Sequence, residues 1–137
     1  MQRQSTEDRI RRTWARAAAV PDETAQLFYS NLFRQDPSTK PLFVGDLRLQ
    51  GQKLVQTLGF FVDHLEAPET LVPAAKELAV KHVGFGVVAE QYASVGQALI
   101  KTLEQLLGGE FTKEDERAWV EVYGILSGIM IETAYGD

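Results

Sequence analysis

Residues 25–33 read Ala-Gln-Leu-Phe-Tyr-Ser-Asn-Leu-Phe, and this stretch indicates the fold class. Its apolar and aromatic positions are Ala25, Phe28, Tyr29, Leu32 and Phe33. Their i, i+3, i+4, i+7, i+8 spacing is typical of a helix that turns one face toward a core. The stretch therefore predicts an amphipathic helix, which Pro21 and Asp22 begin.

Capping patterns mark both ends of the chain. Ser5 with Asp8, and Thr112 with Asp115, have the three-residue spacing of capping boxes. The first precedes an apolar stripe formed by Ile10, Trp14 and Ala17. The second precedes a stripe formed by Trp119, Val122, Tyr123, Leu126 and Met130. The sequence thus predicts a helix near each terminus.

Proline and glycine divide the residues between these two helices. Asp36-Pro37 begins a short helix, which Pro41 limits to about one turn. A long helix follows over residues 47–65, with a stripe that runs through Leu47, Gln50, Leu54, Leu58, Phe61 and Leu65. Two more are expected, one with Leu71, Ala75, Leu78 and His82 on one face, and one over residues 92–107.

These patterns give about seven helices and no convincing pair of strands. We therefore expect one all-α domain that spans residues 1–137. The unequal helix lengths fit a four-helix bundle poorly.

The composition excludes several kinds of chemistry. The 137 residues include no cysteine and two histidines, and the formal net charge is −5. Disulfides, iron–sulfur clusters, thiolate zinc sites and cofactors tethered through sulfur are therefore excluded. An acidic chain is a poor match for nucleic acid or an anionic membrane, so we expect neither as a partner. The N-terminus lacks the pattern of a signal peptide, and we expect a cytoplasmic protein.

Three polar groups lie on faces that are otherwise apolar. They are Tyr29, Gln50 and His82. Taken singly, each has an ordinary explanation: a core tyrosine, a glutamine at the rim and a hydrogen-bonded core histidine. Together, one imidazole on one wall of an apolar slot and two donors on another match a haem pocket. A single proximal histidine leaves the sixth position of a haem iron open to a ligand.

At this point the chain resembles the globin family, in particular the bacterial single-domain globins related to flavohaemoglobins and to neuroglobin. Residues 27–33 resemble the second globin helix, with Tyr29 at a frequent distal position. Pro37 and Phe43 match the proline that begins the third helix and the phenylalanine that wedges the haem. His82, 39 residues after Phe43, matches the proximal histidine.

The resemblance implies roles for the remaining site residues. Gln50 falls at the distal position, Lys53 at a usual partner of a haem propionate, and Leu54 and Phe28 beside the ligand. Tyr92 lies beneath the proximal histidine, and Val95 lies against the haem. His64 competes with His82 as a ligand, but it is fourteen residues after Gln50. That is about 21 Å along the helix, too far to face the same iron.

One position departs from the pattern of flavohaemoglobins. Their proximal histidine is supported by a tyrosine and a buried glutamate from the last helix. Tyr92 matches the tyrosine, but the glutamate position aligns with Ala134. Glu132, the nearest acid, lies about 200° around the helix. We therefore expect a backbone carbonyl to orient His82, and a weaker push of electrons toward the iron.

The resemblance implies a protein that holds haem b without covalent attachment and reversibly binds O₂, NO and CO. An alternative is nitric oxide dioxygenation or nitrite reduction. We expect no flavin domain behind Asp137, so this alternative is expected to work with a separate reductase. A third possibility is a haem-free interaction or sensor module on the same fold.

Overall fold

The computed structural model describes residues 5–43 and 45–136, and no strand occurs among them. Its α-helices are α1 (Thr6–Ala18), α2 (Pro21–Gln35), α3 (Leu47–Asp63), α4 (Pro68–Gly84), α5 (Ala89–Leu107) and α6 (Lys113–Tyr135). Two 3-10 segments connect them: η1 (Pro37–Leu42) and η2 (Gly108–Glu110). The prediction of an all-α fold is therefore confirmed, with the short helix after Pro37 present as η1.

The capping patterns identify the helix ends correctly. The Ser5 hydroxyl accepts a hydrogen bond of 3.0 Å from the Asp8 backbone N–H. At the other end, Thr112 and Asp115 form a reciprocal capping box. Asp36 caps η1 and also accepts a hydrogen bond of 2.7 Å from Ser94. This last bond ties η1 to the first turns of α5.

One expectation about the core is wrong. The apolar stripe of α3 places Leu47 inward, but its side chain is 41% exposed. Leu47 is the first residue of α3, immediately after the cap Asp46. The first turn of a helix often extends beyond the packed part of its face, and a periodic pattern does not reveal where that contact begins.

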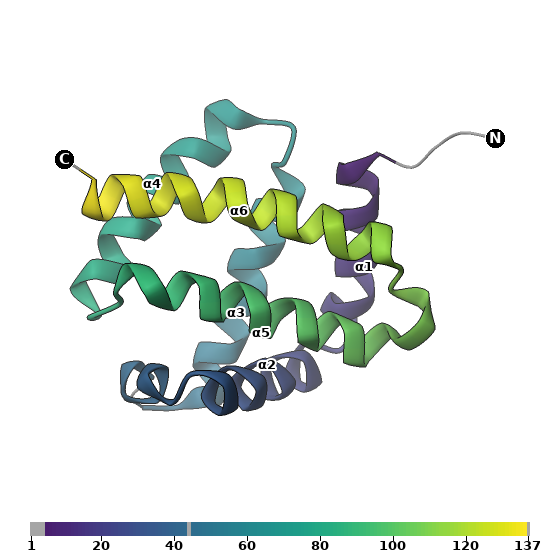
Figure 1. The fold of residues 1–137 in the computed structure, drawn as a ribbon, viewed down its shortest axis with the longest axis horizontal. Helices are drawn as coiled ribbons and strands as arrows, with labels where there is room; N and C mark the ends of the chain where they lie inside the picture. The colour runs from purple at the N-terminus through teal and green to yellow at the C-terminus, as the bar shows by residue number, and fades with distance from the viewer. Residues whose placement is uncertain (1–4, 44, 137) are drawn as a thin grey trace.

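The helices are arranged in crossing directions rather than as a parallel bundle. In Figure 1, α5 and α6 extend across the molecule one above the other, and α3 passes behind them. α2 packs on α5, and α4 packs on α6. The crossing of α2 and α3 is close at Gly51, where a Cβ would lie 2.7 Å from the Cβ of Ala25. This approach requires glycine on α3.

Two clusters of buried residues make up the core. The larger joins α1, α2, α3, α5 and α6, and it includes Ile10, Trp14, Phe28, Leu32, Leu99, Leu103 and Trp119. The smaller joins α3, α4, α5 and α6, and it consists of Phe61, Ala75, Ala79, Tyr92 and Met130. α4 therefore contributes its buried residues to the smaller cluster.

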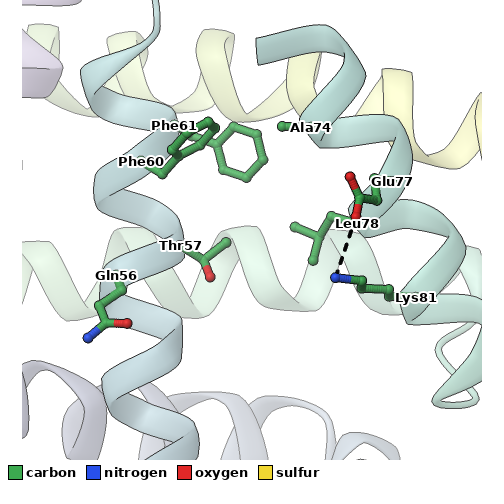
Figure 2. A pocket seen from close by; sticks show the side chains of 8 residues that line it. All are labelled: Gln56, Thr57, Phe60, Phe61, Ala74, Glu77, Leu78 and Lys81. Atoms are coloured by element: carbon green, nitrogen blue, oxygen red, sulfur yellow. Dashed lines mark ion pairs between the residues drawn. The ribbon is translucent and has the colours of Figure 1, made fainter. Parts of the chain in front are cut away.

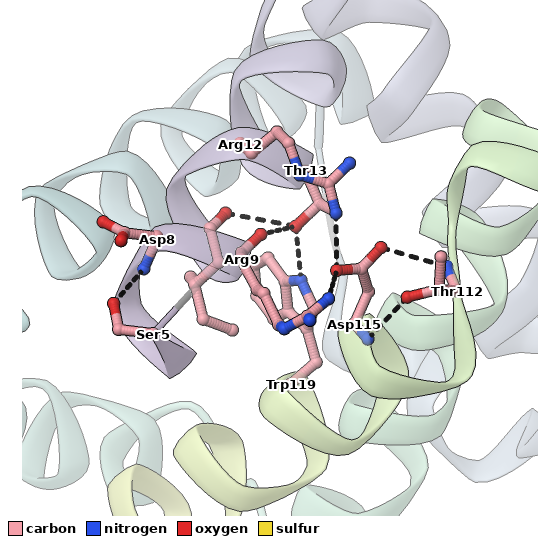
Figure 3. Close-up of polar contacts among 9 residues, drawn as sticks. Ser5, Asp8, Arg9, Arg12, Thr13, Thr112, Asp115 and Trp119 are labelled. Carbon is pink, nitrogen blue, oxygen red and sulfur yellow. Dashed lines mark hydrogen bonds and ion pairs between the residues drawn. The ribbon is translucent and has the colours of Figure 1, made fainter. Parts of the chain in front are cut away.

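A buried carboxylate joins the first and last helices. The Asp115 side chain is fully buried and accepts hydrogen bonds from Arg9 at 3.1 Å and Arg12 at 2.5 Å (Figure 3). Beside it, the indole N–H of Trp119 donates to the hydroxyl of Thr13 at 2.7 Å. These contacts fix α6 against α1. No helix in the described ranges is long and apolar enough to cross a membrane.

Candidate functional site

His82 lies in the last turns of α4 with its ring partly buried. Its Nδ1 is 2.8 Å from the backbone oxygen of Leu78. Because a carbonyl oxygen only accepts, Nδ1 carries the proton, and Nε2 keeps its lone pair. Burial lowers the pKa of His82, although the bond to Leu78 opposes this. A neutral imidazole with a fixed tautomer is the form that binds a metal. The expected carbonyl partner is therefore present.

Tyr92, in the first turns of α5, lies against His82. The two rings stack with centroids 6.0 Å apart and planes inclined by 25°. The Tyr92 hydroxyl is buried and has no hydrogen-bond partner among the described residues. Its backbone oxygen accepts a bond of 2.6 Å from the hydroxyl of Tyr123. Ala134 packs in the same cluster, so no acid reaches Tyr92 from that position.

Tyr29 lies at the centre of an aromatic cluster on the other side of the fold. Its ring is 5.1 Å from that of Phe43 and 5.8 Å from that of Phe33, between centroids. Phe28 approaches it edge-on at 5.7 Å. Burial raises the pKa of Tyr29 to about 12. The hydroxyl therefore stays protonated at neutral pH and is able to donate a hydrogen bond.

Gln50, Lys53 and Leu54 follow one another on the first turns of α3. Gln50 is half-buried, and its Nε2 lies near Gly45, 3.8 Å from where a Cβ on that glycine would be. Lys53 is exposed. Leu54 packs on the larger core cluster, as does Val95 from α5. The start of α3 thus carries the amide of Gln50, the ammonium of Lys53 and the apolar side chain of Leu54.

A cavity of about 330 Å³ opens between α3 and α4 (Figure 2). Its lining residues are Gln56, Thr57, Phe60, Phe61, Ala74, Glu77, Leu78 and Lys81. The nine residues that the sequence singles out are not among them. Two lining residues are near candidate residues in the sequence, because Thr57 is three positions after Leu54 and Lys81 precedes His82. Leu78 is the partner of His82 as well as a lining residue.

Sequence reasoning named none of the eight lining residues as a site residue; Thr57 and Lys81 are two examples. Thr57 lies outside the apolar stripe of its helix, so it did not stand out in the sequence. Lys81 forms an ordinary ion pair of 3.7 Å with Glu77 (Figure 2). The available signal was helical spacing from the predicted residues, since positions three residues apart share a face. Half of the lining residues are polar or charged, and the other half, Phe60, Phe61, Ala74 and Leu78, are apolar.

His64 does not join the site. It is the C-terminal cap residue of α3, and its Nδ1–H donates to the backbone oxygen of Phe60 at 2.7 Å. Its ring stacks on Phe60 with centroids 4.3 Å apart. Within the described ranges, no three histidine or acidic residues converge to hold a metal ion. The described residues thus offer one imidazole nitrogen, which suits a metal that is already bound within a prosthetic group.

These residues fit a flat, largely apolar group that brings its own iron. The donor is Nε2 of His82, the ring nitrogen that does not face Leu78. Aromatic and aliphatic side chains are available on the α2 and α3 side, and Lys53 supplies a positive charge for an acidic substituent. The chemistry of this donor set matches the expected haem.

Comparisons with known proteins agree with this assignment. The sequence profile of the globin family matches residues 26–130. A flavohaemoprotein of Rhizobium meliloti is 32% identical over 130 residues, which cover 93% of this chain and 32% of that protein. One from Bordetella parapertussis is 33% identical over 107 residues, which cover 76% of this chain and 27% of that protein.

The fold also has a counterpart among solved structures. A bacterial globin from Campylobacter jejuni superposes with a TM-score of 0.79 at 23% identity, covering 94% of each chain. The chain spans about a third of the length of the curated relatives it matches.

Proposed function

The chain belongs to the globin family, and from this premise we propose that it holds haem b through His82 and reversibly binds O₂, NO and CO. The observation that carries the proposal is the hydrogen bond of 2.8 Å from His82 Nδ1 to Leu78, which leaves Nε2 available. When bound, the haem supplies the iron at which a diatomic ligand attaches.

The protein's own residues determine how such a ligand is held. On the proximal side, Leu78 fixes the tautomer of His82, and the ring of Tyr92 stacks against it. On the distal side, the proposal gives Tyr29 and Gln50 the role of hydrogen-bond donors. Phe28, Phe43, Leu54 and Val95 exclude water from the apolar part of the pocket, and Lys53 pairs with a propionate.

The light absorption of the purified protein tests this proposal. We expect an intense haem band, and we expect His82→Ala to lose or shift it because the axial ligand is removed. His64→Ala is the matched control and should leave the band unchanged. A colourless protein, or equal spectra for His82→Ala and the parent, would contradict the proposal.

A second candidate is nitric oxide dioxygenation, or nitrite reduction in the ferrous state. The flavohaemoprotein relatives favour it, because their globin portions resemble this chain. The haem, when bound, would supply the redox chemistry, and repeated turnover would require electrons from a reductase. Rapid mixing of the oxygenated protein with NO, with and without a cellular reductase, distinguishes the two functions. Multiple turnovers favour the enzyme, whereas a single turnover favours a carrier or a store.

A further inference from the structure

α6 has a solvent-facing side that we name the outer face. It consists of Arg117, Glu121, Gly124, Gly128 and Glu132, which are all exposed. Steps of four, three, four and four residues place them on one side of the helix. Val120 and Ile125 border this face and are 56% and 61% exposed. The outer face therefore has an apolar centre between charges of opposite sign.

The two glycines of this face have no explanation within the chain. A Cβ at Gly124 or Gly128 would meet nothing within 4 Å. Glycine in the middle of an exposed helix destabilises it by about 1 kcal/mol relative to alanine. Gly51 and Gly96, by contrast, lie where another element approaches the backbone closely. Glycines on the exposed side of a helix allow the backbone of another molecule to approach the helix closely.

The charges on the outer face select the geometry of that approach. In a parallel pair of α6 helices, each charged residue would face its own copy, and like charges would repel. In an antiparallel pair with its two-fold axis between Gly124 and Ile125, Arg117 of each copy lies beside Glu132 of the other. Arg117 and Glu132 form no ion pair with any described residue of their own chain.

The antiparallel register also brings together complementary shapes. Ile125 of one copy lies over Gly124 of the other, so an exposed apolar side chain meets a flat stretch of backbone. Glu121 lies over Gly128, so no carboxylate faces a carboxylate. The two ion pairs lie about 22 Å apart along the helix, at opposite ends of the contact. A two-fold contact of this kind is self-complementary and closed.

We propose that the outer face of α6 binds a second copy of this chain, in an antiparallel dimer with Arg117 of each copy beside Glu132 of the other. A contact made mainly by one helix face is small, so the dimer is weak and reversible. The proposal does not depend on haem binding, and its test is independent of the spectrum.

Sedimentation velocity of the full chain tests the dimer at protein concentrations between about 10 μM and 1 mM. We expect a monomer–dimer equilibrium in this range. Arg117→Glu should weaken it about tenfold, because two attractive pairs become repulsive. Arg34→Glu, an equal charge change on an exposed residue of α2, is the control and should leave the equilibrium unchanged.

The charge swap tests the register itself. Glu132→Arg alone should weaken the dimer, and the double variant Arg117→Glu with Glu132→Arg should restore it. Ile125→Glu should weaken it by burying a charge at the centre. A monomer at all concentrations, equal effects of Arg117→Glu and Arg34→Glu, or a double variant weaker than either single variant would each overturn the proposal.

Discussion

Hydrogen bonds at single residues orient the side chains of the candidate site. His82 is oriented by Leu78, a residue of its own helix one turn earlier, rather than by a distant side chain. The Tyr92 hydroxyl, although buried, has no partner in the described part of the chain. In the described part of the chain, no acidic side chain is bonded to the imidazole. A histidine oriented by a backbone carbonyl alone donates less electron density to a bound metal than one paired with a carboxylate.

The proposed distal donors, Tyr29 and Gln50, give a prediction at the same scale. Tyr29→Phe and Gln50→Leu should each raise the rate of O₂ dissociation about ten- to a hundredfold, because a hydrogen bond to a charged group is worth ~1.5–3 kcal/mol. Stopped-flow displacement of O₂ by CO measures this rate. Gln52→Leu, an exposed position on the same helix, should leave it unchanged. Unaltered rates in both distal variants would remove Tyr29 and Gln50 from their proposed roles.

Close helix crossings determine where the site elements lie. Gly51 allows α3 to approach α2, and the same approach brings the helix of Gln50 beside that of Tyr29. Gly96 does the same between α5 and α6, where a Cβ would lie 2.5 Å from the ring of Tyr123. Each of these two helix crossings thus depends on one glycine contact.

The α2–α3 crossing can be tested by adding a methyl group. Gly51→Ala should lower the free energy of unfolding by about 1–3 kcal/mol, because the methyl overlaps the Cβ of Ala25. Gly59→Ala on the same helix is the control. There the new Cβ would lie an ordinary 3.5 Å from the Trp14 indole nitrogen. We expect the control to be neutral or stabilised by up to ~1 kcal/mol in urea titrations. Equal effects of the two changes would contradict this account.

At the scale of the whole molecule, Asp115 joins the first helix to the last. Burial by itself would raise the pKa of its carboxyl, but hydrogen bonds from Arg12, Thr112 and Arg9 lower it below the ordinary value. A carboxyl whose pKa is lower in the folded than in the unfolded state stabilises the fold above its unfolded pKa, about 3.9. That contribution is lost as the pH falls through the folded pKa.

The lowered pKa of Asp115 gives a prediction for the stability of the protein in acid. Asp115→Asn should lower the free energy of unfolding by about 1–3 kcal/mol at pH 7. The difference between the parent and Asp115→Asn should shrink as the pH falls below about 4, since the parent's carboxyl is then protonated. Urea unfolding followed by circular dichroism at several pH values measures both. Asp8→Asn, on the exposed side of α1, should change little. A difference that grows toward acid pH would refute the assignment.

The sequence by itself determined the helices and singled out His82 as the candidate axial ligand. Hydrophobic spacing and capping residues act locally, so Ser5, Pro21 and Thr112 identify helix starts without a partner. The scarcity of histidine left His82 as the candidate, since His64 lies at the end of α3.

Only the tertiary structure decided which atoms these elements bring together. Asp115 begins as a capping residue in the sequence, yet it meets Arg9 and Arg12 from the opposite end of the chain. The fit of Gly51 against Ala25 and the exposure of Leu47 depend in the same way on how the helices cross. Periodicity reports the direction of a helix face, but crossing angles and distances arise from packing between residues far apart in sequence.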